Sequence, residues 1–79
     1  MDYIIEISGF DPERDCHRAE RKEIRAAGLY EAIRIANRWM ERFVFAEDVS
    51  VYALPGYVFD CLASRRRRGA WEIVRKVKR

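Results

Sequence analysis

One apolar stripe in the middle of the chain constrains the fold more than any other feature. Its members recur at intervals of four, three, four and three residues: Leu29, Ile33, Ala36, Met40 and Phe43. This spacing predicts an α-helix over residues 29–45 with one apolar face. The solvent face is left with polar side chains, among them Arg34, Arg38, Glu41 and Arg42. A helix with a single apolar face must pack that face against another layer.

A strand pattern opens the chain. Residues 3–8 are rich in β-forming side chains, and Tyr3, Ile5 and Ile7 share one side of the segment. Gly9 follows directly and is expected to end the strand.

The segment between this strand and the helix is open to two interpretations. Residues 10–19 are almost wholly polar and lack an apolar stripe, so we expect a loop or a single turn there. Residues 20–26 alternate in the manner of a second strand, with Arg21 and Arg25 on the polar side. The alternative is one continuous helix over residues 12–27.

Three more strand patterns follow the helix, over residues 49–54, 57–64 and 70–78. The first two are separated by the turn dipeptide Pro55-Gly56. The last two are expected to form a hairpin with a three-residue loop, residues 67–69.

The geometry of that hairpin follows from its loop. A loop of this type needs a left-handed residue at its last position, which Gly69 supplies. The predicted pairs are Arg66 with Ala70, Ser64 with Glu72, Leu62 with Val74, Asp60 with Lys76, Ala63 with Ile73 and Phe59 with Val77. Trp71 then belongs to the core side of the sheet.

Together these patterns predict a single small α+β domain over residues 1–79. Its order is β-β-α-β-β-β, with an antiparallel-dominated sheet and one helix packed on one face. The other face of the sheet is expected to stay open.

Length and composition exclude several classes of protein. A chain of 79 residues has room for one small domain. It has no apolar run near the ~20 residues of a membrane span, so we expect a soluble, cytoplasmic protein without membrane contact. His17 is the only histidine, and Cys16 and Cys61 stand 45 positions apart with no CxxC pair. We therefore expect no metal site, no cofactor and no structural disulfide.

Motifs for catalysis are missing as well. The four glycines are isolated, so no glycine-rich phosphate loop is present. No serine stands in a nucleophile motif, and Glu47-Asp48 is better explained as the end of the helix than as an acid–base pair. The sequence therefore predicts a protein that binds rather than an enzyme.

Charge is distributed very unevenly along the chain. The overall net charge is +3, but residues 1–64 carry a net charge of −4 and residues 65–79 carry +7. The basic end begins with four consecutive arginines where a hairpin tip is expected. Three interpretations stay open: a solvated tip that only aids solubility, a contact with nucleic acid, and a contact with an acidic protein surface.

The leading candidates for binding are the arginines of that run together with one lysine of the last strand: Arg65, Arg66, Arg67, Arg68 and Lys76. Arg21 and Arg25 would join them if their strand presents its polar side on the open face of the sheet. Stacking platforms for bases are few, because only Tyr52 and Trp71 are suitable and Trp71 is expected in the core.

A family resemblance is carried by the residues around the start of the helix. The segment Ile24-Arg25-Ala26-Ala27-Gly28-Leu29-Tyr30-Glu31-Ala32-Ile33-Arg34-Ile35-Ala36, together with Tyr3-Ile4-Ile5, resembles the small phage-encoded anti-CRISPR proteins. The likeness is to inhibitors of type I, Cascade-type effector complexes. It covers roughly half of the chain.

The resemblance implies a non-enzymatic inhibitor that binds the subunits of a CRISPR surveillance complex and keeps target DNA from it. It also implies that basic helix residues take part, which by position gives Arg34 and Arg38, whereas Ile33 replaces another basic position. We expect a monomer or weak dimer. The alternative function is a small accessory protein that binds nucleic acid through the arginine-rich hairpin.

Overall fold

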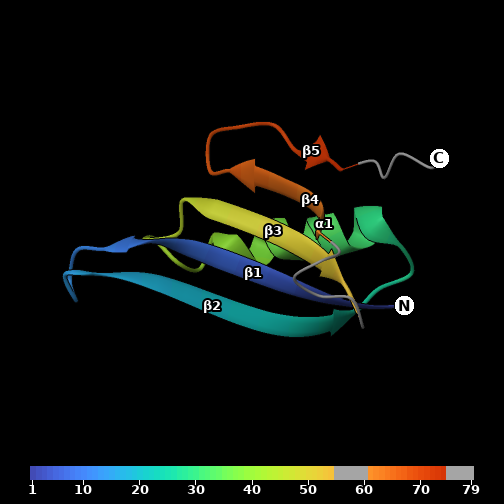
Figure 1. Ribbon diagram of the computed structural model, residues 1–79, viewed down its shortest axis with the longest axis horizontal. Coiled ribbons are helices and arrows are strands. Elements are labelled where there is room, and N and C mark those ends of the chain that lie inside the picture. The colour runs from blue at the N-terminus through green and yellow to red at the C-terminus, as the bar shows by residue number, and fades with distance from the viewer. Residues whose placement is uncertain (55–60, 75–79) are drawn as a thin grey trace.

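The helix and the strands form two layers (Figure 1). The computed structural model describes residues 1–54 and 61–74. In chain order the elements are β1 (Asp2–Asp11), β2 (Cys16–Arg25), α1 (Leu29–Met40), β3 (Asp48–Ala53), β4 (Cys61–Arg66) and β5 (Glu72–Ile73). Neighbouring strands are antiparallel, and the order across the sheet is β2-β1-β3-β4-β5. The predicted α+β class and the β-β-α-β-β-β order are confirmed.

The core lies between α1 and one face of the sheet. Ile5 and Ile7 point there from β1 and are fully buried, because alternate residues of a strand face the same side. Ala32 and Ala36 of α1 are fully buried as well, and their small side chains let the helix lie close to the strands. Burying a side chain the size of Ile5 contributes about 1.5–3 kcal/mol. None of the described residues form a helix with the length and apolarity needed to span a membrane.

The first hairpin is longer than the sequence predicts. The second strand is confirmed against the helical alternative, but β2 begins at Cys16 and β1 continues to Asp11, so most of the expected loop is strand. The polar pattern was misleading because β2 is an edge strand and most of its side chains are exposed. The loop itself closes at Asp15, whose φ of 51° is the left-handed conformation that Asp tolerates.

Gly9 does not end the first strand, contrary to prediction. It is buried in β1, where a Cβ atom would lie 2.1 Å from the carbonyl oxygen of Phe45 and 2.9 Å from the backbone nitrogen of Glu47. The Glu47 N–H donates a hydrogen bond of 2.8 Å to the carbonyl of the neighbouring Ser8. The glycine is therefore needed for the close approach of two backbone segments.

The helix is shorter than predicted, ending at Met40 instead of residue 45. After Met40 the chain turns so that Phe45 and Ala46 are buried in the core. The rings of Phe43 and Phe45 meet edge to face with centroids 5.7 Å apart. The apolar residues after Met40 therefore extend the apolar pattern of the helix in the sequence. In the structure, however, they reach the core from a turn and not from the helix.

The last hairpin keeps the predicted register over β5, but that strand begins at Glu72 and not at residue 70, so the predicted pair of Arg66 with Ala70 is not part of the described ladder. Ala63 pairs with Ile73 and Ser64 with Glu72, as expected. The prediction of a left-handed backbone conformation at Gly69 is wrong, because no described glycine has a positive φ. The turn is instead closed by a hydrogen bond of 2.9 Å from the Gly69 N–H to the Arg66 carbonyl. The predicted turn at Pro55-Gly56 and the pairs that involve residues 59, 60, 76 and 77 lie outside the described residues.

Replacing Gly9 with Ala tests the backbone contact. We expect the free energy of unfolding to fall by about 1–3 kcal/mol, the usual cost of overpacking, because the new methyl group meets rigid backbone. Gly28→Ala is the matched control, since a Cβ there meets nothing within 4 Å, and its effect should stay below about 1 kcal/mol. Urea denaturation measures both variants, and equal losses would contradict the account of Gly9.

Asp11 makes part of the stability dependent on pH. The side chain is 8% exposed, and the Arg18 Nη1 atom lies 3.0 Å from its Oδ2 atom. The hydrogen bond from Arg18 lowers the pKa of this carboxyl below its ordinary value of 3.8. A lowered pKa stabilises the fold above the unfolded-state value and loses that contribution as the pH falls through the folded-state value. Asp11→Asn should therefore be less stable than the native protein at pH 7, and thermal melting should show the gap closing below about pH 4. A gap that is constant with pH would contradict this.

Candidate partner-binding surfaces

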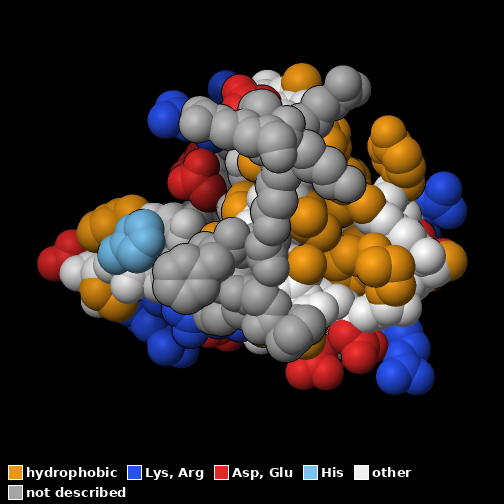
Figure 2. Space-filling model, turned by 45° about the vertical axis from the view of Figure 1, so that its right-hand side comes forward, with side chains coloured by type: hydrophobic (Ala, Val, Ile, Leu, Met, Phe, Trp, Pro, Cys, Tyr) orange, Lys and Arg blue, Asp and Glu red, His pale blue; other side chains and the backbone are white. Residues whose placement is uncertain are grey.

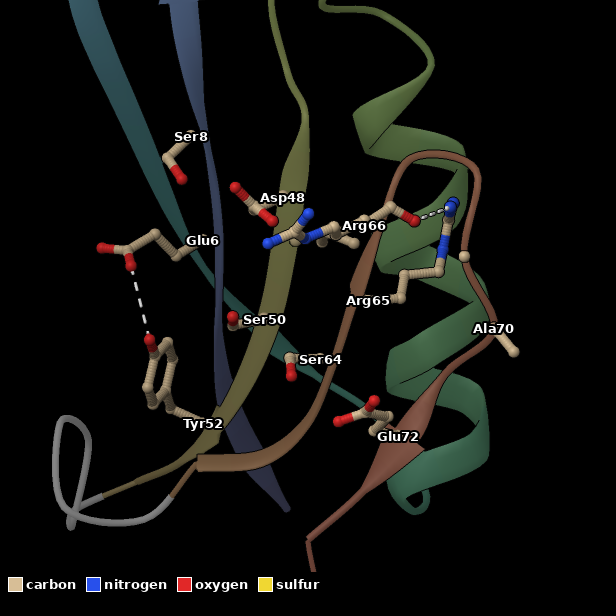
Figure 3. Close-up of a pocket in the computed structure, with 12 residues that line it drawn as sticks. Glu6, Ser8, Asp48, Ser50, Tyr52, Ser64, Arg65, Arg66, Ala70 and Glu72 are labelled. Atoms are coloured by element: carbon tan, nitrogen blue, oxygen red, sulfur yellow. Dashed lines mark hydrogen bonds between the residues drawn. The ribbon is translucent and has the colours of Figure 1, made fainter.

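The four consecutive arginines do not form one surface patch. Arg65 and Arg66 are the last two residues of β4, and their side chains point in opposite directions because neighbouring residues of a strand face opposite sides, as Figure 3 shows. Arg65 and Arg67 are half-buried, and Arg66 and Arg68 are exposed. Lys76 lies outside the described residues. Figure 2 likewise shows the described Lys and Arg side chains at several separate places around the edge of its view.

Arg65 fixes the turn to the helix. Its Nε atom donates a hydrogen bond of 2.9 Å to Asn37 Oδ1, which also accepts one of 3.1 Å from Trp71 Nε1. Its Nη1 atom donates to the carbonyls of Arg66 and Arg67 at 3.1 and 2.7 Å. The guanidinium carbon lies 5.6 Å from the centroid of the Trp71 ring, so a cation–π contact completes its surroundings. Trp71 is half-buried against the core, as predicted.

Arg67 closes the C-terminal end of α1. Its Nη2 atom donates to the carbonyls of Met40 and Phe43 at 3.3 and 2.6 Å, and its Nε atom donates to Ala46 at 2.6 Å. The last carbonyls of a helix lack partners within the helix and carry partial negative charge, so a guanidinium there is favourable. These bonds also explain why the chain can leave the helix at Met40. The guanidinium group of Arg67 is therefore engaged in hydrogen bonds within the fold.

Arg21 and Arg25 lie on the open face of the sheet, the condition under which they were expected to join the basic surface. Each is paired there with a carboxylate of β1. Arg21 Nε is 2.6 Å from Glu6 Oε2, and Arg25 Nε is 3.0 Å from Asp2 Oδ1. The hydrogen bond from Arg25 to Asp2 raises the pKa of the guanidinium. The positive charge of Arg21 and Arg25 is thus balanced by carboxylates on the neighbouring strand β1.

A groove of 740 Å³ lies on the open face, over β1, β3 and β4 (Figure 3). Its floor holds Ser50 and Ser64, which pair across β3 and β4. Its lining includes three acidic residues, Glu6, Asp48 and Glu72, and two basic ones, Arg65 and Arg66, of which Arg65 turns its guanidinium toward the helix. Acidic groups therefore outnumber basic ones, which is the opposite of a track for phosphates.

Other titratable groups of this face are held neutral. The Tyr52 hydroxyl lies 3.4 Å from Glu6 Oε1, and burial raises the pKa of the phenol. Burial also raises the pKa of the Cys61 thiol, which donates to the Ala63 carbonyl at 3.8 Å. Cys16 and Cys61 are both free thiols. Across residues 1–54 and 61–74, no group of three or more His, Cys, Asp or Glu side chains is placed to hold a metal ion.

The outer face of α1 and the turn after it also carry exposed positive charge. Arg34 and Arg38 are exposed on the helix, and Arg42 is exposed just past its end. Arg34 and Arg38 stand four residues apart, which is about 6 Å along a helix axis, and Arg42 follows four residues later in the turn after Met40. None of the ion pairs among the described residues involves them. Like charges at this spacing cost an isolated helix about 0.2–0.5 kcal/mol per pair.

A small pocket adjoins this basic stripe where α1 lies beside β2. It measures 140 Å³ and is lined by Lys22, Ile35, Arg38, Trp39 and Arg42. Sequence reasoning placed Arg42 on the solvent face but did not include it, or Lys22, among the binding residues. The four-residue spacing from Arg38 could have identified Arg42 as a binding residue from the sequence. Lys22 could not be identified in this way, because only the fold brings it from β2 to the helix.

Comparison of the chain with protein-family models, with curated proteins and with solved structures found no match.

Exchanging Arg67 for Gln tests its role at the end of the helix. We expect the free energy of unfolding to fall by about 1.5–3 kcal/mol, because three carbonyl groups lose a charged donor. Arg68→Gln removes the same charge from the exposed neighbour and should change stability by less than about 0.5 kcal/mol. Guanidinium denaturation compares the two variants, and equal stability would mean that Arg67 does not hold the helix end.

Proposed function

We propose that this protein is a non-enzymatic inhibitor of a type I CRISPR surveillance complex. It acts in the bacterial cytoplasm by attaching to a protein subunit of the complex and keeping target DNA away. The outer face of α1, with Arg34, Arg38 and Arg42, is the contact surface. The resemblance of residues 24–36 to anti-CRISPR proteins supports the class of partner.

Two observations together support the choice of surface: Arg34, Arg38 and Arg42 recur every four residues along α1 and the turn after it, and none of the ion pairs among the described residues involves them. A partner's carboxylates can approach these guanidinium groups without breaking an internal pair. Charge complementarity of this kind speeds association and selects the partner. Arg34 and Arg38 are also carried by a helix packed on the core, so these two groups keep a fixed spacing.

The arginine-rich turn is a weaker contact surface for two physical reasons. Arg65 and Arg67 make their hydrogen bonds within the fold, and breaking these would cost stability. Arg66 stands opposite Asp48 in the sheet and beside a groove richer in carboxylates. These observations favour a protein partner at the helix over nucleic acid at the hairpin.

The test is co-elution with a purified Cascade complex. Changing Arg34, Arg38 and Arg42 together to Gln should weaken binding at least tenfold, because each contact removed was charge-assisted. The control changes Arg66 and Arg68 to Gln and should bind as the native protein does. Circular dichroism checks that both variants keep the fold.

Two results would overturn the proposal. One is equal retention of both variants by the complex. The other is a shift of labelled DNA by the isolated protein with a steep salt dependence and no co-elution with the complex, which would establish the accessory nucleic-acid-binding function instead.

A further inference from the structure

We propose that the pocket between α1 and β2 anchors an acidic amphipathic helix of the partner protein. The inference rests on the proposed function, since it identifies what the basic face of α1 recognises. The pocket is lined by Lys22 from β2 and by Ile35, Arg38, Trp39 and Arg42 from the helix and its end.

The lining combines an apolar floor with a basic rim. Ile35 and Trp39 are half-buried and pack against the core, whereas Lys22, Arg38 and Arg42 are exposed. The Trp39 ring meets Phe43 edge to face, with centroids 5.4 Å apart, so the indole is held in place. A ligand that fits must offer an apolar group for the floor and negative charge for the rim. A lone phosphate or carboxylate would meet only half of these features.

No carboxylate is among the described residues that line the pocket. All three charged residues of the lining are cations from two different elements, Lys22 on one side and Arg38 and Arg42 on the other. Their mutual repulsion is not relieved by any ion pair among residues 1–54 and 61–74. A ligand carboxylate between them relieves it, which is a reason for the pocket to be filled by an acidic group.

Spacing favours a helix over nucleic acid. The arginines of the stripe repeat every four residues, which matches acidic side chains at the same interval on a facing helix. Glu31 is exposed on the same helix, and Glu41 is exposed at its C-cap. A continuous row of phosphates would meet these two carboxylates, whereas a protein helix can place neutral or basic side chains opposite them.

The experiment uses a synthetic helical peptide in which Leu and Glu each recur every fourth residue. Its two comparators are the same peptide with every Glu replaced by Gln and a short DNA duplex of matched charge. Calorimetry measures affinity for the full-length protein, and tryptophan emission reports the site. Emission should change when the acidic peptide binds the native protein and should not change in Trp39→Phe.

Charge variants then locate the contact. Arg38→Gln with Arg42→Gln should weaken peptide binding at least tenfold, and the corresponding Lys variants should weaken it less because charge is kept. Arg66→Gln with Arg68→Gln removes the same charge from the turn and should leave affinity unchanged. Equal weakening by both Gln pairs would overturn the location.

The remaining outcomes decide the chemistry of the ligand. Equal binding of the neutral peptide, tighter binding of the duplex at the same residues, or no binding of any probe would each overturn the inference. Co-elution with the Cascade complex that survives loss of Arg38 and Arg42 but fails when Arg34 is changed as well would overturn the anchor and leave the proposed function in place. Peptide binding to the pocket without co-elution with the complex would overturn the proposal of a CRISPR partner. It would leave in place the inference that the pocket anchors an acidic helix.

Discussion

Burial of the single apolar face of α1 against the sheet is the constraint on which the rest of the structure depends. Ala32 and Ala36 lie against the strands with no exposure, so the helix cannot rotate without leaving a void or exposing Met40. The same constraint turns Arg34 and Arg38 outward. Packing in the core therefore determines which charges are available to a partner.

Runs of charge in a sequence need not become patches on a surface. Alternation along β4 sends Arg65 toward Asn37 of the helix and Arg66 toward the open face, and the turn brings Arg67 to the carbonyls at the end of α1. Arginines that stand four residues apart on a helix, by contrast, stay on one side. Among the described residues, the arginines that lie together on one side without an ion pair thus come from helical spacing, whereas the run of four divides between the fold and the surface.

Local patterns were enough to predict the parts of the fold that depend on local physics. The alternation of Tyr3, Ile5 and Ile7 and the stripe of α1 identified the buried faces, and the short loop gave the register of Ser64 with Glu72. Long-range contacts decided the rest. The need for glycine at position 9 is explained by the backbone of Phe45 and Glu47. The end of α1 is explained by the side chain of Arg67, 27 positions from Met40 in sequence. A local sequence pattern contains neither contact.

The central claim is that the outward arginines of α1 meet the partner. Arginine-selective chemical footprinting of the protein, free and bound to a purified type I surveillance complex, tests it most directly. The account predicts that Arg34, Arg38 and Arg42 lose reactivity on binding while Arg66 and Arg68 keep theirs. Protection of Arg66 and Arg68 with the helix arginines still reactive would contradict it.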